Sequence, residues 1–200
     1  MKSIDILKFI EEQGGITTAA RLKKAGFTPG SIDYAYQCGD IDKPSRGVYC
    51  CFDSLDDDFA TVCLRWKRCI LSHGSSLYLL GLSDRVPSAL DVTVPHGYNP
   101  KSLKEENPGI RIHRVSPALH GLGLIEVKTP MGNTTRCYDA ERSVADLIKQ
   151  RLKGGVDAQL IRDAVGGYFR MEGRDLARLS QMCEALGVRD ELQTYLEVLT

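Results

Sequence analysis

The first quarter of the chain repeats apolar positions at helical spacing between turn residues. Residues 4–10 place isoleucine and leucine three apart, and Gly14 and Gly15 end that stripe. Residues 17–25 predict a short second helix. Residues 28–38 predict a third, because they begin with a threonine suited to an N-cap and a proline suited to the first helical position. Three short helices in succession are typical of a helix-turn-helix module.

The next segment, "GDIDKPSRGVYCC" at residues 39–51, predicts a β-hairpin. Lys43 and Arg46 are expected around its apex, and the strand over residues 48–52 is expected to pair back onto the first strand. Its two adjacent cysteines point to opposite faces of a strand, so they are poorly placed to hold one ion together. A hairpin after three helices predicts a winged helix-turn-helix domain over residues 1–52.

The pattern changes at "SLDDDF", residues 54–59, which marks the domain boundary, and residues 53–58 hold four aspartates and no basic residue. Beyond them helical and strand periods alternate. The expected strands are 89–95, 109–116, 124–130 and 134–139, and the expected helices are 70–82, 139–152 and three amphipathic stripes within 156–200. We therefore predict an α+β protein, in which residues 53–200 form a mixed α/β domain that ends in a helical cap.

Composition narrows the class of protein. Hydrophobic residues make up 42% of the 200-residue chain, which is ordinary for a globular fold. No stretch approaches the roughly 18 consecutive apolar residues of a membrane span, and residues 1–10 are amphipathic rather than a signal sequence. The seven cysteines form no CxxC pair, which favours reduced thiols over disulfides or zinc. We therefore expect a cytoplasmic protein that has no membrane partner.

Charge is balanced overall but unevenly distributed. Basic and acidic residues number 26 each, whereas residues 1–52 carry a net +1, residues 59–155 a net +6 and residues 156–200 a net −3. The basic middle segment either extends a phosphate-facing surface or is simply a solvated face. Its candidate cations are Arg65, Lys67, Arg68, Arg85, Lys101, Lys104, Arg111 and Arg114.

The predicted third helix is the candidate for reading DNA, because the second helix of a helix-turn-helix enters the major groove. If Ile32, Ala35 and Tyr36 face the core, the outward side chains are Thr28, Ser31, Tyr34 and Gln37. Glutamine suits adenine, and hydroxyl groups contact phosphate or base. Asp33 opposes this reading, because a carboxylate repels phosphate. A generic helical bundle with a hydrated polar face is the alternative.

Cations on the hairpin favour DNA over that alternative. Lys43 and Arg46 would lie on sugar-phosphate, and each contact would make binding more sensitive to salt. The second helix would add backbone contacts from Arg21, Lys23 and Lys24.

Three blocks of the sequence resemble the AbiEi antitoxins of type IV toxin–antitoxin (abortive infection) systems. "GGITTAARLKKAGFTPGSIDYAYQCGDIDKPSRGVYC" resembles their N-terminal winged helix, "LSHGSSLYLLGLSDRVPSALDVTVP" the start of their second domain, and "YDAERSVADLI" a helix within it. The resemblance implies a phage-defence antitoxin, without catalysis or cofactor, that represses its own operon at inverted repeats. It also implies that the chain counters a nucleotidyltransferase-like toxin without necessarily forming a stable complex. Ser31, Tyr34, Gln37, Lys43, Arg46 and Tyr49 become DNA contacts by this resemblance, although the recognition helix carries fewer cations than the family pattern.

Other chemistries are weaker alternatives. Asp91 with Glu126 and Lys128 is similar to the acidic and E-x-K elements of a metal-dependent nuclease, a pattern that also arises by chance. His73 lacks a nucleophile motif and is expected to cap the helix over residues 70–82 together with Ser75. A winged-helix transcription factor with a ligand-sensing second domain is the other alternative.

One further pair of charges is expected to be structural. Arg142 and Asp146 are four residues apart on a predicted helix, the spacing at which two side chains on one helix face can meet.

Overall fold

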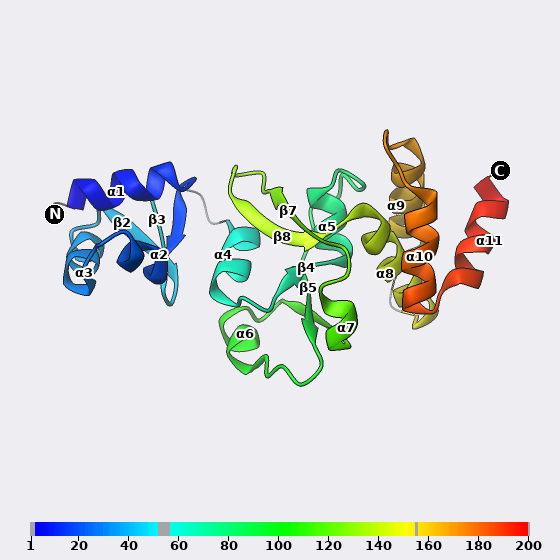
Figure 1. The fold of residues 1–200 in the computed structure, drawn as a ribbon, viewed down its shortest axis with the longest axis horizontal. Helices are drawn as coiled ribbons and strands as arrows, with labels where there is room; N and C mark the ends of the chain where they lie inside the picture. The colour runs from blue at the N-terminus through cyan, green and yellow to red at the C-terminus, as the bar shows by residue number, and fades with distance from the viewer. Residues whose placement is uncertain (1–2, 52–56, 155, 200) are drawn as a thin grey trace. The chain divides into compact units, whose positions relative to one another are not determined.

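The computed structural model of the chain describes residues 3–51, 57–154 and 156–199 (Figure 1). The fold is mixed α+β, with about half of the residues in helices and with two separate β-sheets. The predicted α+β class is confirmed. Among the described residues, no helix combines the length and the apolar character that crossing a membrane requires.

The chain divides into two units by its internal contacts. The first unit runs to Cys69 and includes Glu126–Thr135, and the second comprises Ile70–Ile125 and the residues from Arg136 onward. The predicted boundary at residues 52 and 53 falls outside the described residues. The helix that follows this boundary groups with the N-terminal elements.

In the first unit the N-terminal elements follow the order helix, strand, helix, helix, strand, strand. They are α1 (Ser3–Glu12), β1 (Ile16–Thr18), α2 (Ala19–Lys24), α3 (Pro29–Gln37), β2 (Ile41–Ser45) and β3 (Val48–Cys51), and α4 (Asp58–Arg65) comes next. The three expected helices and the hairpin are all present. Strand β1 is an addition that no sequence pattern indicated. It pairs antiparallel with β3 and makes the sheet three-stranded in the order β1-β3-β2.

Strand β3 lies between two hydrophobic clusters, because alternate side chains of a strand point to opposite faces. Tyr49 and Cys51 join the core formed with α1, α2 and α3. Val48 and Cys50 pack on the other face with Ala60 of α4. Both cysteines are therefore small core residues, each in its own cluster, and β3 has no face exposed to solvent.

The second sheet has five strands in the order β6-β5-β4-β8-β7. Pairing is antiparallel between β4 and β5 and parallel for β5 with β6 and for β4 with β8. The strands are β4 (Ile70–Leu71), β5 (Asp91–Pro95), β6 (Arg111–Val115), β7 (Leu124–Lys128) and β8 (Thr134–Tyr138). Two short helices accompany them, α6 (Lys101–Glu106) and α7 (Pro117–His120). All four predicted strands are confirmed.

The predicted helix over residues 70–82 is only partly correct. Its first two residues form β4, and helix α5 covers His73–Leu79. Ser72 occupies the N-cap position without a side-chain cap bond. The Ser75 hydroxyl instead accepts a hydrogen bond from the Asp91 N–H at 2.8 Å. The expectation that His73 and Ser75 cap this helix is therefore wrong.

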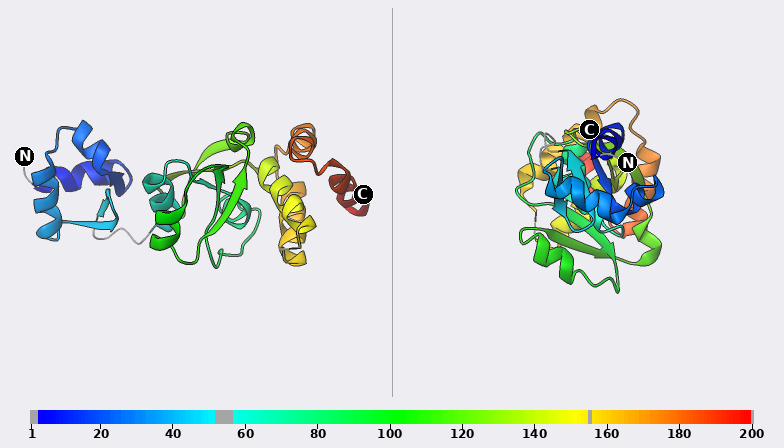
Figure 2. Two further views of the ribbon diagram at one scale, coloured as in Figure 1. Left: turned by 90° about the horizontal axis from the view of Figure 1, so that it is seen from below. Right: turned by 90° about the vertical axis from the view of Figure 1, so that its left-hand side faces the viewer.

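The second unit ends in four helices around one hydrophobic core. They are α8 (Ala140–Leu152), α9 (Ala158–Arg170), α10 (Leu176–Leu186) and α11 (Arg189–Leu199), and the core also includes Leu77 of α5. The views in Figures 1 and 2 show α8 and α10 side by side, in agreement with their many close contacts. The predicted helical C-terminal segment is confirmed, and α8 begins at the expected cap, where the Asp139 carboxylate accepts from the Arg142 N–H at 2.8 Å.

Arg142 is the largest fully buried side chain of the described residues, with 0% exposure. Its Nε donates to Asp146 at 3.0 Å, and its Nη1 donates to the carbonyl oxygens of Leu119 and Leu122 at 2.7 and 2.9 Å. Its guanidinium carbon lies 4.2 Å from the ring centroid of Tyr138. The expected pair of Arg142 with Asp146 is confirmed, and it ties α8 to the chain around α7.

Candidate nucleic-acid interface

Helix α3 begins with a threonine and a serine that bond to each other. Thr28 Oγ1 accepts from the Ser31 N–H at 3.2 Å, and the Ser31 hydroxyl donates to the Thr28 carbonyl at 2.9 Å. The first bond satisfies a backbone donor that a helix N-terminus otherwise leaves unpaired. Both residues were expected to face DNA; Thr28 is exposed and Ser31 is half-buried. Their hydroxyls therefore first fix the start of the helix.

The outward face of α3 carries Asp33, Tyr34 and Gln37, all exposed, with Tyr34 at 62%. A hydrogen bond with the Cys38 thiol raises the pKa of Tyr34 above its ordinary value, so the phenol stays neutral at physiological pH. Ile32 and Ala35 are buried on the opposite side, as predicted. The outward face of the helix thus combines acidic, aromatic and amide side chains.

Two tyrosine rings lie close to the ammonium group of Lys43. Lys43 Nζ is 5.8 Å from the ring centroid of Tyr36 and 5.7 Å from that of Tyr49. Tyr36 was expected in the core, but it is 42% exposed. Tyr49 was expected to contact DNA, but it is 9% exposed and packs in the N-terminal core. Cation–π contacts at exposed sites contribute about 0.5–1 kcal/mol each, so the two rings orient Lys43 beside α3.

The apex of the hairpin is Arg46–Gly47, and Lys43 lies within strand β2 instead of at the turn. Gly47 has a φ of 78°, a left-handed conformation that glycine adopts without strain. The Gly47 carbonyl accepts from the Ala19 N–H at 2.9 Å and so ties the apex to the first residue of α2. The Arg46 side chain is exposed at this apex.

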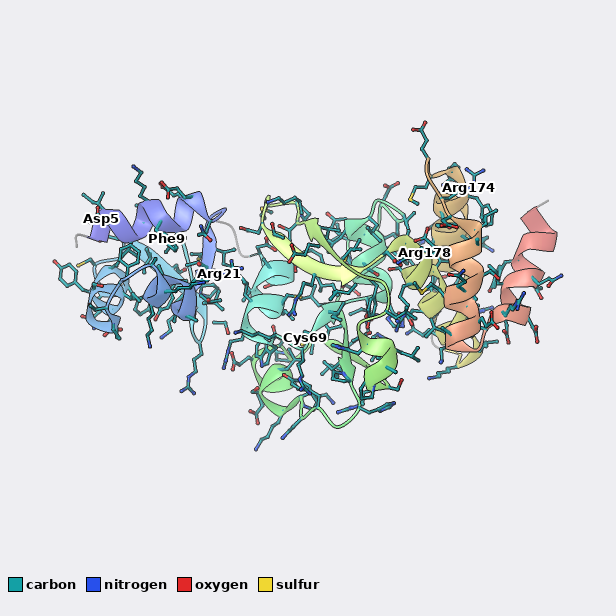
Figure 3. All side chains as sticks on the ribbon, in the orientation of Figure 1. Asp5, Phe9, Arg21, Cys69, Arg174 and Arg178 are labelled. Carbon is teal, nitrogen blue, oxygen red and sulfur yellow. The ribbon has the colours of Figure 1, made fainter. Side chains whose placement is uncertain are left out.

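Three exposed cations, Arg21, Lys23 and Lys24, occupy the last turn of α2 (Arg21 is labelled in Figure 3). Cations at this end of a helix are favoured by the helix dipole. Leu22 between them is buried, so the cationic side chains point away from the core. The first unit therefore presents cations on α2 and on the hairpin, with α3 between these elements in sequence.

Many cationic side chains of the basic middle segment, residues 59–155, already interact with other groups of the fold. Interactions within the second unit include Arg85 with Asp157 at 2.8 Å, Lys101 with Glu105 at 3.9 Å, Arg111 with Asp91 at 3.1 Å, and Arg114 with the Tyr98 carbonyl at 3.4 Å. More than half of the eight cations considered for a phosphate-facing surface are thus already engaged, since Arg65 also lies 5.3 Å from the Trp66 ring centroid. The net +6 of this segment is a poor measure of charge available to a ligand.

The residues of the nuclease alternative do not come together. Asp91 is on β5, whereas Glu126 and Lys128 are on β7, and the sheet order places β4 and β8 between these strands. Neighbouring strands are about 4.8 Å apart, so three strand spacings exceed the reach of one shared metal ion. The Asp91 carboxylate instead holds Arg111 at 3.1 Å and His113 at 2.9 Å.

His73 and His113 stack with their ring centroids 3.6 Å apart, and His73 is the only non-glycine residue with a positive φ, 49°, in the described chain. Its Nδ1 lies 3.0 Å from the Ser72 hydroxyl. Burial, followed by the nearby charge of His113, lowers the pKa of His73 well below the ordinary value. The imidazole is therefore neutral near pH 7. Among the described residues, no three His, Cys, Asp or Glu side chains converge closely enough to hold a metal ion.

Comparison with known proteins finds no family model and no curated protein that matches this chain. Among solved structures, the chain is similar to the crystal structure of the RV2827C protein from Mycobacterium tuberculosis, at 15% sequence identity and a TM-score of 0.47. The alignment covers 96% of this chain and 79% of that one. A likeness at this level supports no inference about function.

Proposed function

We propose that the N-terminal elements form a winged helix-turn-helix that binds duplex DNA, and that the protein is a transcriptional repressor of its own operon. The observation that carries this proposal is the exposed face of α3, flanked in sequence by the cationic end of α2 and by a hairpin with exposed Lys43 and Arg46. In this arrangement α3 lies in the major groove and the hairpin is the wing.

The charges of α2, α3 and the hairpin indicate which of them contacts phosphate and which contacts bases. The wing and α2 supply cations for phosphate, whereas the outward face of α3 supplies none. Phosphate contacts set affinity and register, and base contacts set specificity. Lys43 and Arg46 are thus affinity residues, and Tyr34 and Gln37 are specificity residues.

The antitoxin role rests on the sequence resemblance to AbiEi proteins. In this role the protein counters a nucleotidyltransferase-like toxin encoded beside it. Co-expression tests it directly: a neighbouring nucleotidyltransferase gene that arrests growth alone and not together with this chain supports the role. Arrest in both cases contradicts it while leaving the DNA-binding proposal intact. The separation of Asp91 from Glu126 in the sheet order disfavours the nuclease alternative.

Footprinting of the chain's own promoter tests the DNA-binding proposal. The full-length protein is expected to protect a discrete segment, and affinity should fall steeply as salt is raised. Replacing Lys43 and Arg46 by alanine should flatten the slope of log affinity against log salt by about two units, since each lost phosphate contact removes about one.

A matched control variant removes the same number of positive charges from a different part of the chain. Lys101 and Lys104 are exposed on α6, so their replacement by alanine removes the same two charges from another helix. This control should leave the salt slope unchanged. Absence of any protection, even in dilute buffer, contradicts the proposal. Equal slopes for both double variants contradict the assignment of the wing.

A further inference from the structure

The outward face of α3 has an unusual composition for a helix that meets DNA. Residues 28–40 contain no lysine and no arginine, and they include Asp33 and Asp40. The outward side chains are Tyr34 and Gln37, with Asp33 beside them. Residues three and four apart on a helix are neighbours on its surface, so these three side chains form one patch.

The chemistry of this patch matches one kind of base pair. Adenine offers an acceptor at N7 and a donor at N6, which the amide of Gln37 meets with its own donor and acceptor. The other strand of the same pair carries the thymine methyl group, which favours apolar contact. Tyr34 is 62% exposed, and a hydrogen bond with the Cys38 thiol raises the pKa of its phenol further above physiological pH.

The patch also disfavours guanine. Guanine presents two acceptors in the major groove, and the side chains that meet them best are arginine and lysine. The face of α3 offers neither, and the Asp33 carboxylate repels both acceptors. Cytosine alone would suit Asp33, but its guanine partner would then lie against the same acidic patch.

We infer that α3 selects A·T base pairs, with Gln37 on adenine and the ring of Tyr34 on the thymine methyl group. This inference rests on the proposed DNA-binding function. It assigns specificity to two residues and leaves affinity to Lys43, Arg46 and the cations of α2. Exposed Gln37 and exposed Tyr34 then act on the two strands of one or two adjacent base pairs.

Selection from a random pool of duplexes tests the inference and requires no prior choice of operator sequence. The full-length protein is incubated with duplexes that contain about 20 random base pairs, enough to span a site of two half-sites one helical turn apart, and bound DNA is sequenced over several rounds. The wild-type chain should enrich a motif with adjacent A·T pairs. Gln37→Ala should reduce the preference for adenine at one position by about fivefold or more, the lower bound for a bidentate contact.

The thymine contact is tested on the enriched duplex itself. Replacing single thymines by uracil removes only the methyl group, and one such replacement should weaken wild-type binding about fourfold, the effect of losing one buried methyl. Tyr34→Ala should abolish that sensitivity. Tyr34→Phe is the matched control: it keeps the ring, so the sensitivity should remain. Circular dichroism confirms that the exposed substitutions leave the fold intact.

The outcomes separate this inference from the proposed function. An enriched motif dominated by G·C pairs, or wild-type binding that is indifferent to uracil at every thymine, overturns the inference while DNA binding stands. A motif unchanged in Gln37→Ala also overturns it. No enrichment, with no duplex retained even at low salt, overturns the proposed function together with the inference.

Discussion

Replacement of Arg142 by methionine probes the most deeply buried charge in the described chain. Arg142 has 0% exposure and holds Asp146, also buried, at 3.0 Å. Methionine fills most of the same volume and removes the guanidinium. The substitution therefore leaves the Asp146 carboxylate and the Leu119 and Leu122 carbonyl oxygens without the donor that they share.

The expected loss is large. Removing one partner of a buried ion pair costs about 3–5 kcal/mol, because the other charge stays buried without compensation. We expect a loss of about 4 kcal/mol in the free energy of unfolding, which for a chain of this size lowers Tm by about 10 °C. Replacing Asp146 by leucine in the same variant removes the stranded charge. The double variant should then lose about 2 kcal/mol, mostly because the Leu122 carbonyl loses its charged donor while the Leu119 carbonyl keeps only backbone N–H donors.

The pH dependence adds an independent readout. Burial raises the pKa of Asp146, and the charge of Arg142 opposes that shift. In Arg142→Met the main opposing charge is gone and burial outweighs the smaller effects of His113 and Lys149, so the folded chain holds a proton on Asp146 that the unfolded chain has released. Stability of this variant should therefore rise as the pH falls from about 7 toward 5, relative to the parent.

Urea unfolding of the parent, both Arg142 variants and Arg178→Met provides the measurement. Arg178 (labelled in Figure 3) is the control, because it also reaches an aspartate from a helix, Asp139 of the α8 cap, but its side chain is 46% exposed. Its loss should cost less than the loss of Arg142, because solvent already reaches the Arg178 side chain and Asp139 keeps its bond from the Arg142 N–H. A cost below about 1 kcal/mol for Arg142→Met, or a double variant no more stable than the single one, would refute the reasoning.

Three further substitutions test other parts of the fold. Gly123→Ala should lower the free energy of unfolding, measured in urea, by about 2–4 kcal/mol, because Gly123 has a φ of 80° and a Cβ there would lie 2.7 Å from the Cβ of Arg142. An unchanged stability would contradict that close approach. His73→Asn keeps a residue that tolerates positive φ and removes the imidazole. Because the fold lowers the pKa of His73, the free energy of unfolding of the parent should fall as the pH drops below about 6.5, by at most about 1.4 kcal/mol per pH unit. The variant should lose less stability over the same range. Equal slopes of unfolding free energy against pH would show that His73 does not cause the effect. Asp57→Ala should cost about 3 kcal/mol, because the Asp57 carboxylate caps α4 at 3.0 Å and also accepts from the Thr129 hydroxyl and from Asn133 Nδ2. Thr129→Val removes the Thr129 hydroxyl, which bonds Asp57 and the Asn133 N–H, but leaves the cap and the Asn133 Nδ2 bond to Asp57, so it should cost less. The reverse order would contradict the assignment.

The elements that the sequence predicted correctly are those whose ends are encoded locally. Helix α3 starts at Thr28 and Pro29, and α8 starts at Asp139, as their capping residues indicated. Four strands of the second sheet followed from alternation of apolar and polar residues. These signals do not depend on segments that are distant in the chain.

The missed elements depend on distant partners. Strands β1 and β4 have three and two residues, and they exist because β3 and β5 pair with them. Residues 70–82 have helical spacing throughout, but pairing takes the first two into the sheet. His73 then turns the chain into α5 with a positive φ.

The candidate interface was predicted in outline and corrected in detail. Tyr36 was assigned to the core because it follows Ile32 by four residues, about 40° around the helix, yet Tyr36 is 42% exposed and its ring lies 5.8 Å from Lys43 Nζ. The apex was placed near Lys43, although the dipeptide Arg46–Gly47 carried a usable signal, since glycine provides the positive φ of a tight hairpin turn. No local pattern indicated that Tyr36 and Tyr49 converge on Lys43.

The double-sided packing of β3 limits how this molecule can be divided. A fragment that stopped at Cys51 would leave Ile16, Val48 and Cys50 uncovered, and an open apolar sheet of this kind promotes aggregation. The smallest N-terminal fragment that keeps both faces of β3 covered must therefore extend through α4. Fusion proteins that borrow only the helices and hairpin should precipitate unless those three positions are made polar.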